Sequence, residues 1–569
     1  MNYAALLHRP MSEFAHALDD HTYIFRLRTA REDVNKCTFY YADRAEMSPE
    51  LHFAALSMPC VRRDPYYDWY EITLHTEYLR IAYYFLLESG EETCYYAGDC
   101  FETTATLSRS DYFQLPFNLR SDRLSIPDWV HDAVVYNIFP DSFADRKRHL
   151  SCLPSKADYQ GEACHSLLGG TVCGIRENLD YIHFLGCNCI YLNPMFAANA
   201  YHKYDLIDYY HIDPTRGTDE EFCDMVRDAH EMGIRVIIDG VFNHVSWRHP
   251  FFQDVLQKGK ASPYYDWFYG LPDHPRYPNA GEAAGYLCFS YVSEMPKMNT
   301  ANPAVRDYFC KVGEYWIRKF DVDGWRLDVA NEVDDVFLRT FRSAVKRQKP
   351  DALVIGEVWE NANHYLLGSL LDSAMNYDFR RFCSQFFAKG TLDAAAFDLR
   401  VSQLLMRYPK QATAAQLNLL DSHDVSRFLT LCSNDPDRME LAVLFQMTFV
   451  GMPSVFYGDE KGLTGIAERE YRQAMRFDRQ NILESVYRQF IALRREYPAL
   501  RRGDFRTLSA QGMVYGFRRS YQGEAVNIYM NAGNTPVHLP AQKQILLQKG
   551  WDCGLLKAKG YVVSLEGSM

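Results

Sequence analysis

The stretch NPAVRDYFCKVGEYWIRKFDVDGWRLDV, residues 302–329, decides the fold class of this chain. Up to residue 320 its apolar residues recur at helical spacing, and residues 323–329 then form a short apolar run of strand type. A long amphipathic helix that leads into a short buried strand is the repeating unit of a parallel α/β fold.

The same unit recurs through the middle of the chain. Further helical patterns occupy residues 177–186 and 219–233. Eight apolar runs of strand type follow one another at residues 133–139, 187–192, 234–240, 323–329, 352–358, 373–379, 415–421 and 453–459. Eight such units predict an α/β fold, a (β/α)8 TIM barrel, over residues 126–498. The Trp-, Tyr- and Pro-rich stretch at about 245–300 is too long for a plain crossover, so we expect a small insertion after strand 3.

Both ends of the chain have the composition of β-structure. Residues 1–125 contain runs rich in β-branched and aromatic residues, which predict an N-terminal β-sandwich. These runs lie at residues 22–30, 37–41, 69–74 and 79–88. Residues 499–569 contain similar runs at 513–520, 524–533 and 544–548, and we expect a C-terminal β-sandwich there.

Charge and hydropathy exclude two classes of partner. The 569 residues include 61 Lys and Arg against 73 Asp and Glu, a net charge of −12. A protein that binds the phosphate backbone needs a basic surface, so we expect no nucleic-acid partner. No uninterrupted apolar stretch approaches the ~18 residues of a membrane span, so we expect no membrane association.

Cysteine usage and the N-terminus indicate a compartment. The 15 cysteines show no paired C-x-x-C spacing. The first residues, MNYAALLHRPMSEFAHALDD, lack a basic start followed by a long apolar stretch and a small-residue cleavage site, so no signal peptide is predicted. Unpaired thiols without an export signal are typical of a reducing compartment, and we expect a cytoplasmic protein.

Four acidic residues stand at the ends of predicted strands: Asp239, Asp328, Glu357 and Asp424. Catalytic groups of TIM barrels lie at the carboxyl-terminal ends of the strands. A single acid at such a position is more often an ion-pair partner or a helix cap. Four of them at one rim would repel one another, which indicates a site that needs them.

Arg326 and Asp328 lie two residues apart and therefore face the same side of a strand. We expect the guanidinium to lower the pKa of Asp328 by about 1–3 units and to keep it ionised as a nucleophile. Glu357, surrounded by like charges, would favour its protonated form and serve as a general acid. Such a pair suits glycoside hydrolysis, with retention of configuration if the carboxyls lie about 5–5.5 Å apart.

Seven ordered segments resemble signature regions of the α-amylase family, glycoside hydrolase family 13. They are HKYD (202–205), DGVFNH (239–244), MPKMN (295–299), GWRLDVANE (324–332), GEVW (356–359), LLDSHD (419–424) and GMPSVFYGDE (451–460). MPKMN together with VANE is similar to the branch that contains neopullulanases, cyclomaltodextrinases and maltogenic amylases. The N-terminal and C-terminal modules are similar to that branch as well.

The resemblance implies a role for each matching position. Asp328 would be the nucleophile, Glu357 the general acid/base and Asp424 a third acid that holds sugar hydroxyls. Tyr204 would stack under the sugar at the cleavage site, and Trp359 and Phe289 would line the leaving-group side. The remaining implied substrate-binding residues are Asp205, Asp239, His244, Arg326, His423 and Arg472.

Together these features predict a retaining α-glucan hydrolase. Its expected substrates are the α-1,4 bonds of maltooligosaccharides, cyclomaltodextrins or pullulan, with some transglycosylation. An α-glucanotransferase or isomerase on the same fold is one alternative. A non-catalytic carbohydrate-binding scaffold, from another class of protein, is the second.

Two expectations concern metals and partners. The basic stretch FADRKRHLSC (143–152) stands where relatives often carry a calcium loop, and Glu332 stands where many α-amylases place a histidine whose carbonyl binds calcium. We therefore expect no required metal, although calcium binding stays open. The resemblance also implies a homodimer formed through the N-terminal module. Direct starch binding is the other role open to that module, and its aromatic stretch YYDWY (66–70) suits either.

Overall fold

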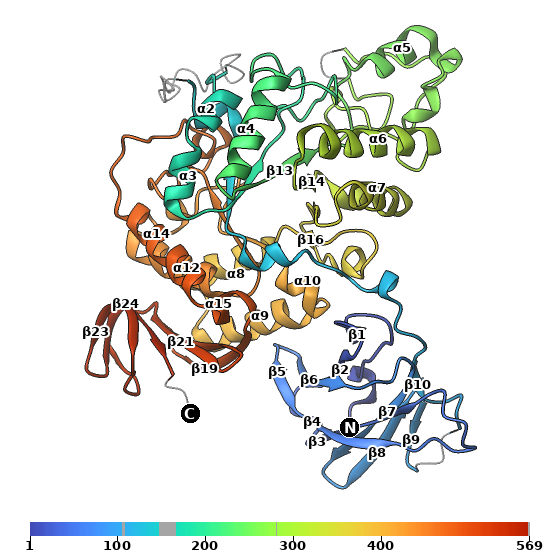
Figure 1. Ribbon diagram of the computed structural model, residues 1–569, viewed down its shortest axis with the longest axis vertical. Helices are drawn as coiled ribbons and strands as arrows, with labels where there is room; N and C mark the ends of the chain where they lie inside the picture. The colour runs from blue at the N-terminus through green and yellow to red at the C-terminus, as the bar shows by residue number, and fades with distance from the viewer. Residues whose placement is uncertain (99, 105–107, 147–166, 280–281, 567–569) are drawn as a thin grey trace.

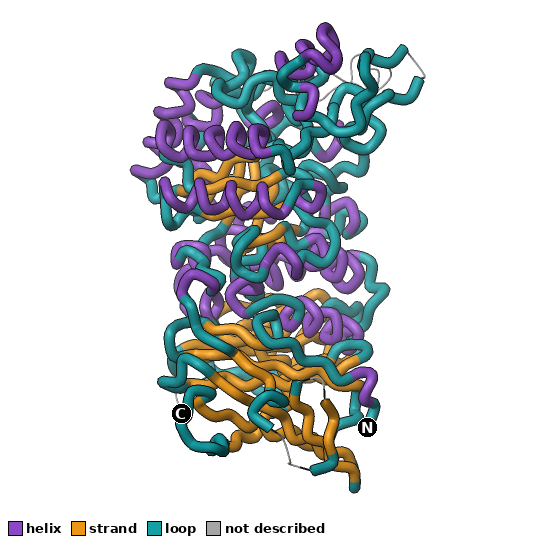
Figure 2. Tube along the Cα trace, turned by 90° about the vertical axis from the view of Figure 1, so that its right-hand side faces the viewer, coloured by secondary structure: helices purple, strands orange, loops and turns teal. Residues whose placement is uncertain are grey.

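The computed structural model describes residues 1–98, 100–104, 108–146, 167–279 and 282–566. Within these ranges the chain forms a helix-covered barrel and two sheet modules (Figure 1). Both sheet modules lie at the same end of the elongated molecule (Figure 2). In the part of the chain so described, no helix is long and apolar enough to span a bilayer.

All eight expected barrel strands are present. In sheet order they are β16 (Ser373–Ala374), β15 (Leu353–Gly356), β14 (Gly324–Leu327), β13 (Arg235–Gly240), β12 (Cys189–Leu192), β11 (Val135–Ile138), β18 (Met452–Phe456) and β17 (Leu417–Leu419). Neighbours run parallel, and a parallel bridge between Met375 and Leu417 closes the ring. The TIM-barrel prediction is confirmed.

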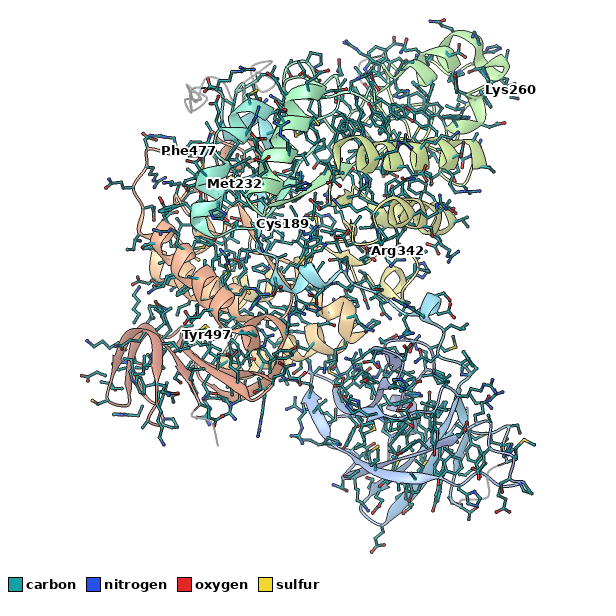
Figure 3. The ribbon with its side chains drawn as sticks, viewed as in Figure 1. Cys189, Met232, Lys260, Arg342, Phe477 and Tyr497 are labelled. Carbon is teal, nitrogen blue, oxygen red and sulfur yellow. The ribbon has the colours of Figure 1, made fainter. Side chains whose placement is uncertain are left out.

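Helices pack around the barrel, apart from one in the excursion that follows β13. In Figure 3, Cys189 of β12 lies between Met232, just after α4, and Arg342 on α7. The helices are α1 (Pro140–Phe143), α2 (Val172–Arg176), α3 (Leu179–Leu185), α4 (Asp219–Glu231), α5 (Pro250–Lys258), α6 (Pro303–Phe320), α7 (Asp335–Gln348), α8 (Tyr377–Cys383), α9 (Ala394–Met406), α10 (Lys410–Ala414), α11 (Phe428–Leu431), α12 (Pro436–Thr448), α13 (Glu468–Tyr471), α14 (Ile482–Glu496) and α15 (Pro498–Arg502). The helical patterns read at 177–186, 219–233 and 302–320 correspond to α3, α4 and α6.

The register of the central strands positions the site. Asp239 on β13 pairs with Arg326 on β14, and Leu327 on β14 pairs with Gly356 on β15. In a parallel pair the register continues past the last hydrogen-bonded residue. The next residues of the two chains, Asp328 and Glu357, therefore leave the barrel side by side.

The segment between β13 and α6 is an excursion from the barrel. It contains α5 and two short 3-10 turns, η6 (Gly259–Ala261) and η7 (Tyr265–Trp267). A bridge between His244 and Lys297 joins its beginning to its end. The excursion thus returns to the rim from which it starts.

The N-terminal module is a sandwich of two antiparallel sheets. One contains β1 (Ala15–Ala17), β2 (Thr22–Ala30), β6 (Tyr67–His75) and β5 (Cys60–Arg63). The other contains β4 (Ala54–Met58), β3 (Lys36–Asp43), β7 (Ile81–Ser89), β8 (Glu92–Ala97), β9 (Cys100–Glu102) and β10 (Phe113–Leu115). Phe25 of the first sheet packs on Phe39 and Tyr83 of the second, with ring centroids 4.6 and 4.7 Å away.

The C-terminal module differs from the expected sandwich. Its strands, β19 (Asp504–Gln511), β20 (Val514–Tyr521), β21 (Glu524–Asn531), β22 (Val537–His538), β23 (Ile545–Asp552) and β24 (Leu555–Leu565), form one antiparallel sheet. The barrel helices supply the second layer: Phe517 packs on Phe445 of α12, and Tyr561 packs on Phe490 of α14. Because the barrel covers the apolar face, no second sheet is needed.

Candidate active site

The guanidinium group of Arg326 contacts three carboxylates at the carboxyl ends of β13, β14 and β15. Arg326 is fully buried, and its Nη1 lies 2.9 and 3.0 Å from the two carboxylate oxygens of Asp239. The same nitrogen donates to Asp328 Oδ1 at 2.8 Å, and Nη2 lies 2.9 Å from Glu357 Oε2. The predicted convergence of acids from separate strands is present.

The protonation of this cluster differs from the sequence-based expectation. Burial raises the pKa of Asp328 well above its ordinary value, the charge of Glu357 raises it further, and Arg326 opposes both. The expected lowering of that pKa is therefore wrong, because the spacing reveals the arginine but not the burial. One guanidinium cannot balance three carboxylates, so burial and mutual repulsion favour protonation within the cluster.

Glu357 is oriented by two donors. Its Oε2 accepts from the backbone N–H of Val329 at 3.0 Å, and its Oε1 accepts from the indole Nε1 of Trp359 at 3.0 Å. Val329 has a φ of 45°, in the left-handed region that β-branched residues avoid. Sequence reasoning gave no signal for this strained residue, which aims a backbone donor at the acid.

Tyr204 and His423 continue the network. The Tyr204 hydroxyl lies 3.1 Å from Asp239 Oδ2 and 2.5 Å from His423 Nε2, and the two rings are parallel within 7°. Burial lowers the pKa of His423 well below its ordinary value, so the imidazole is neutral. The amide nitrogen of Asn193, a residue that sequence reasoning missed, lies 2.9 Å from Nδ1 and 3.3 Å from Nε2 of this ring.

Asp424 lies beside this histidine and keeps partial access to solvent. Its Oδ2 is 3.0 Å from His423 Nε2, and its side chain is 24% exposed. Burial raises the pKa of Asp424 to about 7, and the negative charge of Glu357 acts in the same direction. A carboxyl in this state can accept or donate hydrogen bonds to sugar hydroxyls.

Arg472 supports His423 and Asp424 from behind. Its Nε donates to the His423 carbonyl at 2.7 Å, and its Nη2 lies 3.4 Å from Asp424 Oδ1. Its Nη1 donates to the Tyr201 hydroxyl at 3.0 Å and to Glu468 Oε1 at 2.7 Å. These contacts occupy the guanidinium within the protein, so Arg472 is a positioning residue.

His244 and Phe289 line the side reached by the excursion. The Nε2 of His244 donates to the Tyr204 carbonyl at 3.1 Å, and its ring centroid lies 5.0 Å from that of Phe289. Burial lowers the pKa of His244 to about 3, so this imidazole is also neutral. Phe289 is half-buried and therefore presents part of its ring to solvent.

Trp359 is the exposed aromatic next to the acid. Its ring is 49% exposed and stacks on Tyr377 with centroids 3.8 Å apart. Its indole N–H holds Glu357, as described above. The structure thus fixes one face of the ring against Tyr377, a residue whose part sequence reasoning missed, and leaves the other free for a ligand.

Asp205 is the predicted residue whose contacts lead away from the acids. It is 2% exposed, and its Oδ1 accepts from the backbone N–H of Ala200 at 2.8 Å. Burial raises the pKa of Asp205. These contacts fold the loop that carries Tyr204, so Asp205 shapes the site from below the surface.

The barrel and its paired carboxyls define the class of protein: a TIM-barrel glycoside hydrolase. The family model described as "Alpha amylase, catalytic domain" matches residues 137–495, and "Alpha amylase, N-terminal ig-like domain" matches residues 1–118. The chain belongs to the α-amylase family.

Individual relatives cover all or nearly all of the chain. A cyclomaltodextrinase of Geobacillus thermopakistaniensis is 40% identical, over 100% of this chain and 97% of its own length. Neopullulanase 2 of Thermoactinomyces vulgaris is 38% identical, over 93% of this chain and 90% of its own. A solved cyclomaltodextrinase structure superimposes with a TM-score of 0.90 at 33% identity, covering 100% and 98% of the two chains.

The raised pKa of Asp424 makes a prediction about stability. With a pKa of about 7 against an ordinary 3.8, the folded state binds a proton that the unfolded state releases. The carboxyl therefore favours folding less and less as pH rises from about 4 to 7. We therefore expect the unfolding free energy of Asp424→Asn, relative to the wild type, to rise by about 2 kcal/mol between pH 5 and pH 8.

Thermal unfolding at both pH values checks this expectation. Exposed Asp552 in the C-terminal sheet provides the matched control, since Asp552→Asn should shift the Tm equally at the two pH values. A stabilisation by Asp424→Asn that is the same at pH 5 and pH 8 would contradict the raised pKa.

Proposed function

We propose that this protein is a retaining hydrolase of α-1,4-glucosidic bonds in maltooligosaccharides, cyclomaltodextrins or pullulan, with transglycosylation as a side reaction. One observation carries the proposal: Asp328 and Glu357 contact the two terminal nitrogens of one buried guanidinium, at 2.8 and 2.9 Å. Two carboxyls held this close can flank a single sugar bond. The cyclomaltodextrinase and neopullulanase relatives support the substrate class.

The chemistry follows from these positions. Glu357 protonates the glycosidic oxygen while Asp328 attacks the anomeric carbon and forms a covalent glycosyl-enzyme. Glu357, now a carboxylate, then removes a proton from water, which displaces Asp328 with a second inversion. The first step requires a proton on Glu357 and an ionised Asp328, which Arg326 stabilises.

The remaining groups serve binding. Tyr204 presents a ring for stacking, while Asp424 and the neutral imidazoles His244 and His423 can hold the hydroxyls of the same sugar. Trp359 and Phe289 offer exposed aromatic surface on the leaving-group side. Flat exposed rings suit bulky or bent acceptors, such as the α-1,6 junction of pullulan or a cyclic dextrin.

A substrate panel tests the proposal. We expect new reducing ends from cyclomaltodextrins, pullulan and maltotriose, with the α-anomer released first in NMR spectra of the products. Asp328→Asn, which keeps the size of the side chain but removes the nucleophile, should lower kcat at least about a thousandfold with little change in Tm.

Each alternative predicts a different result on the same panel. Longer saccharides without any gain in reducing ends would identify a transferase or isomerase. Binding without turnover by the folded wild type would identify a carbohydrate-binding scaffold. Release of the β-anomer, or unchanged turnover in Asp328→Asn, would overturn the retaining mechanism.

We propose further that catalysis needs no metal. The Glu332 carbonyl, whose position matches a calcium ligand of many α-amylases, accepts from Lys297 Nζ at 3.1 Å. The same ammonium donates to Asn243 Oδ1 and lies 3.0 Å from the Glu332 carboxylate. The ammonium group of Lys297 thus already contacts these oxygens, and they do not fit a calcium ion in addition. Of the basic stretch 143–152, residues 147–152 lie outside the described ranges.

Chelation tests metal independence. We expect excess EDTA to leave both kcat and Tm unchanged, and added calcium to restore nothing, because Lys297 supplies the positive charge at this position. A loss of activity in EDTA that calcium reverses would contradict the proposal.

A cytoplasmic location and a homodimer complete the proposal. All 13 cysteines in the described residues are free, which supports a reducing compartment.

Trp69 and Tyr70 of the YYDWY stretch are buried, so Tyr66, which is 65% exposed, is the ring that this stretch offers to a partner or to starch. Thiol titration after native purification tests the reducing compartment, and disulfides in the native protein would refute it. Light scattering tests the homodimer, and a monomer at micromolar concentration would refute it.

A further inference from the structure

A pocket of about 370 Å³ lies where the three parts of the chain meet, away from the acids. Its walls come from β5 and β6 of the N-terminal sandwich, from α9 and α10 of the barrel, and from α15, β19 and β20 at the C-terminal end. In Figure 1, β5 lies next to α9 and β19 at this junction. We refer to it as the junction pocket.

The lining of the junction pocket is strongly cationic. Its carboxylates are Glu71 and Asp504, whereas its basic residues are Arg26, Arg62, Lys410, Arg501, Arg502 and Arg519. The whole chain carries a net charge of −12, so this concentration of positive charge runs against the overall balance.

Two of the arginines have no carboxylate partner among the described residues. Arg62 donates to the Phe505 carbonyl and to the Thr507 hydroxyl. Arg519, fully buried, donates to the backbone carbonyls of Gly503 at 2.8 Å and Leu500 at 3.0 Å. Carbonyl dipoles satisfy the N–H groups, but they do not cancel the charge.

The other four cations of the lining are in ion pairs, so the unpaired positive charge is that of Arg62 and Arg519. Arg26 pairs with Glu71 at 2.7 Å and Lys410 with Asp504 at 2.9 Å. Outside the lining, Asp128 and Asp132 pair with the two remaining arginines. Four of the six cations are thus in ion pairs with four carboxylates, and Arg62 and Arg519 are the two that are not. Burial, assisted by the nearby charge of Arg494, lowers the pKa of Arg519 to about 9.

The pocket also contains polar atoms without partners. Thr413, 7% exposed, has a buried hydroxyl with no hydrogen bond within the described structure. His131 Nδ1 and Arg501 Nε, on two other lining residues, are likewise buried without a partner in the described structure. Unsatisfied buried polar groups are costly, and three of them around one cavity indicate a missing polar occupant.

We propose that the junction pocket binds a small phosphate-bearing anion, either inorganic phosphate or the phosphate group of a sugar phosphate. A dianion would neutralise the two unpaired guanidinium charges, and its oxygens would accept from Arg501 Nε and the Thr413 hydroxyl. The volume leaves room for a sugar attached to the phosphate. Because the walls come from all three modules, the bound anion would stabilise their docking.

Ligand-dependent unfolding of the full chain tests the proposal. At constant ionic strength, with chloride as reference, inorganic phosphate should raise the Tm in a saturable way, and ³¹P NMR should show broadening of its line. Titrations with glucose 1-phosphate and glucose 6-phosphate separate the two sources, since tighter binding than phosphate would identify a sugar phosphate. These readouts do not depend on hydrolysis, so they succeed or fail independently of the proposed function.

Three variants locate the site. Lys410→Gln, on a side chain 40% exposed, and Thr413→Val, nearly identical in shape, should each weaken phosphate binding, the charge change by roughly tenfold. Lys389→Gln makes the same charge change on an exposed residue outside the pocket and should bind like the wild type. No saturable shift in the wild type, or equal shifts in all variants, would overturn the proposal.

Discussion

The buried guanidinium of Arg326 is the interaction on which the site depends. Without its positive charge, Asp239, Asp328 and Glu357 could not share one water-poor rim, because their mutual repulsion and desolvation would be uncompensated. The arginine is fully buried on β14 and touches all three. It still falls two charges short of neutralising them. That deficit favours protonation within the cluster, and general acid catalysis requires a protonated carboxyl.

The barrel supplies the geometry for this charge arrangement. Parallel pairing of β13, β14 and β15 puts residues of equal register at one height, so strand pairing brings the nucleophile and the acid together. Loops then fix the details. The strained Val329 aims its N–H at Glu357, and the indole of Trp359 does the same from the other side. The rigid strands thus bring the two carboxyls together, and the strained loop that follows β14 orients Glu357.

Buried arginines recur at the junctions of the three modules. Arg26 from the sandwich donates to the carbonyls of Met406 and Tyr408 in the barrel. Arg519 repeats the pattern from the C-terminal sheet. In both cases a guanidinium donates to backbone oxygens of the barrel, which joins the modules. Arg26 also pairs with Glu71, whereas Arg519 has no carboxylate partner among the described residues. Function and docking in this chain therefore both rest on guanidinium groups held away from water.

The sequence by itself determined the fold and the identity of the central acids. Short apolar runs marked all eight barrel strands, helical periodicity marked three of the helices between them, and the position of Asp328 and Glu357 at the ends of two strands indicated one shared rim. Burial, by contrast, is a property of the folded chain. It reversed the expected pKa of Asp328, turned Asp205 into a support for a loop, and let the barrel replace the second sheet of the C-terminal module. Tyr377, Asn193 and Val329 entered the site only through contacts between distant segments, because a linear pattern carries no record of which side chains meet in space.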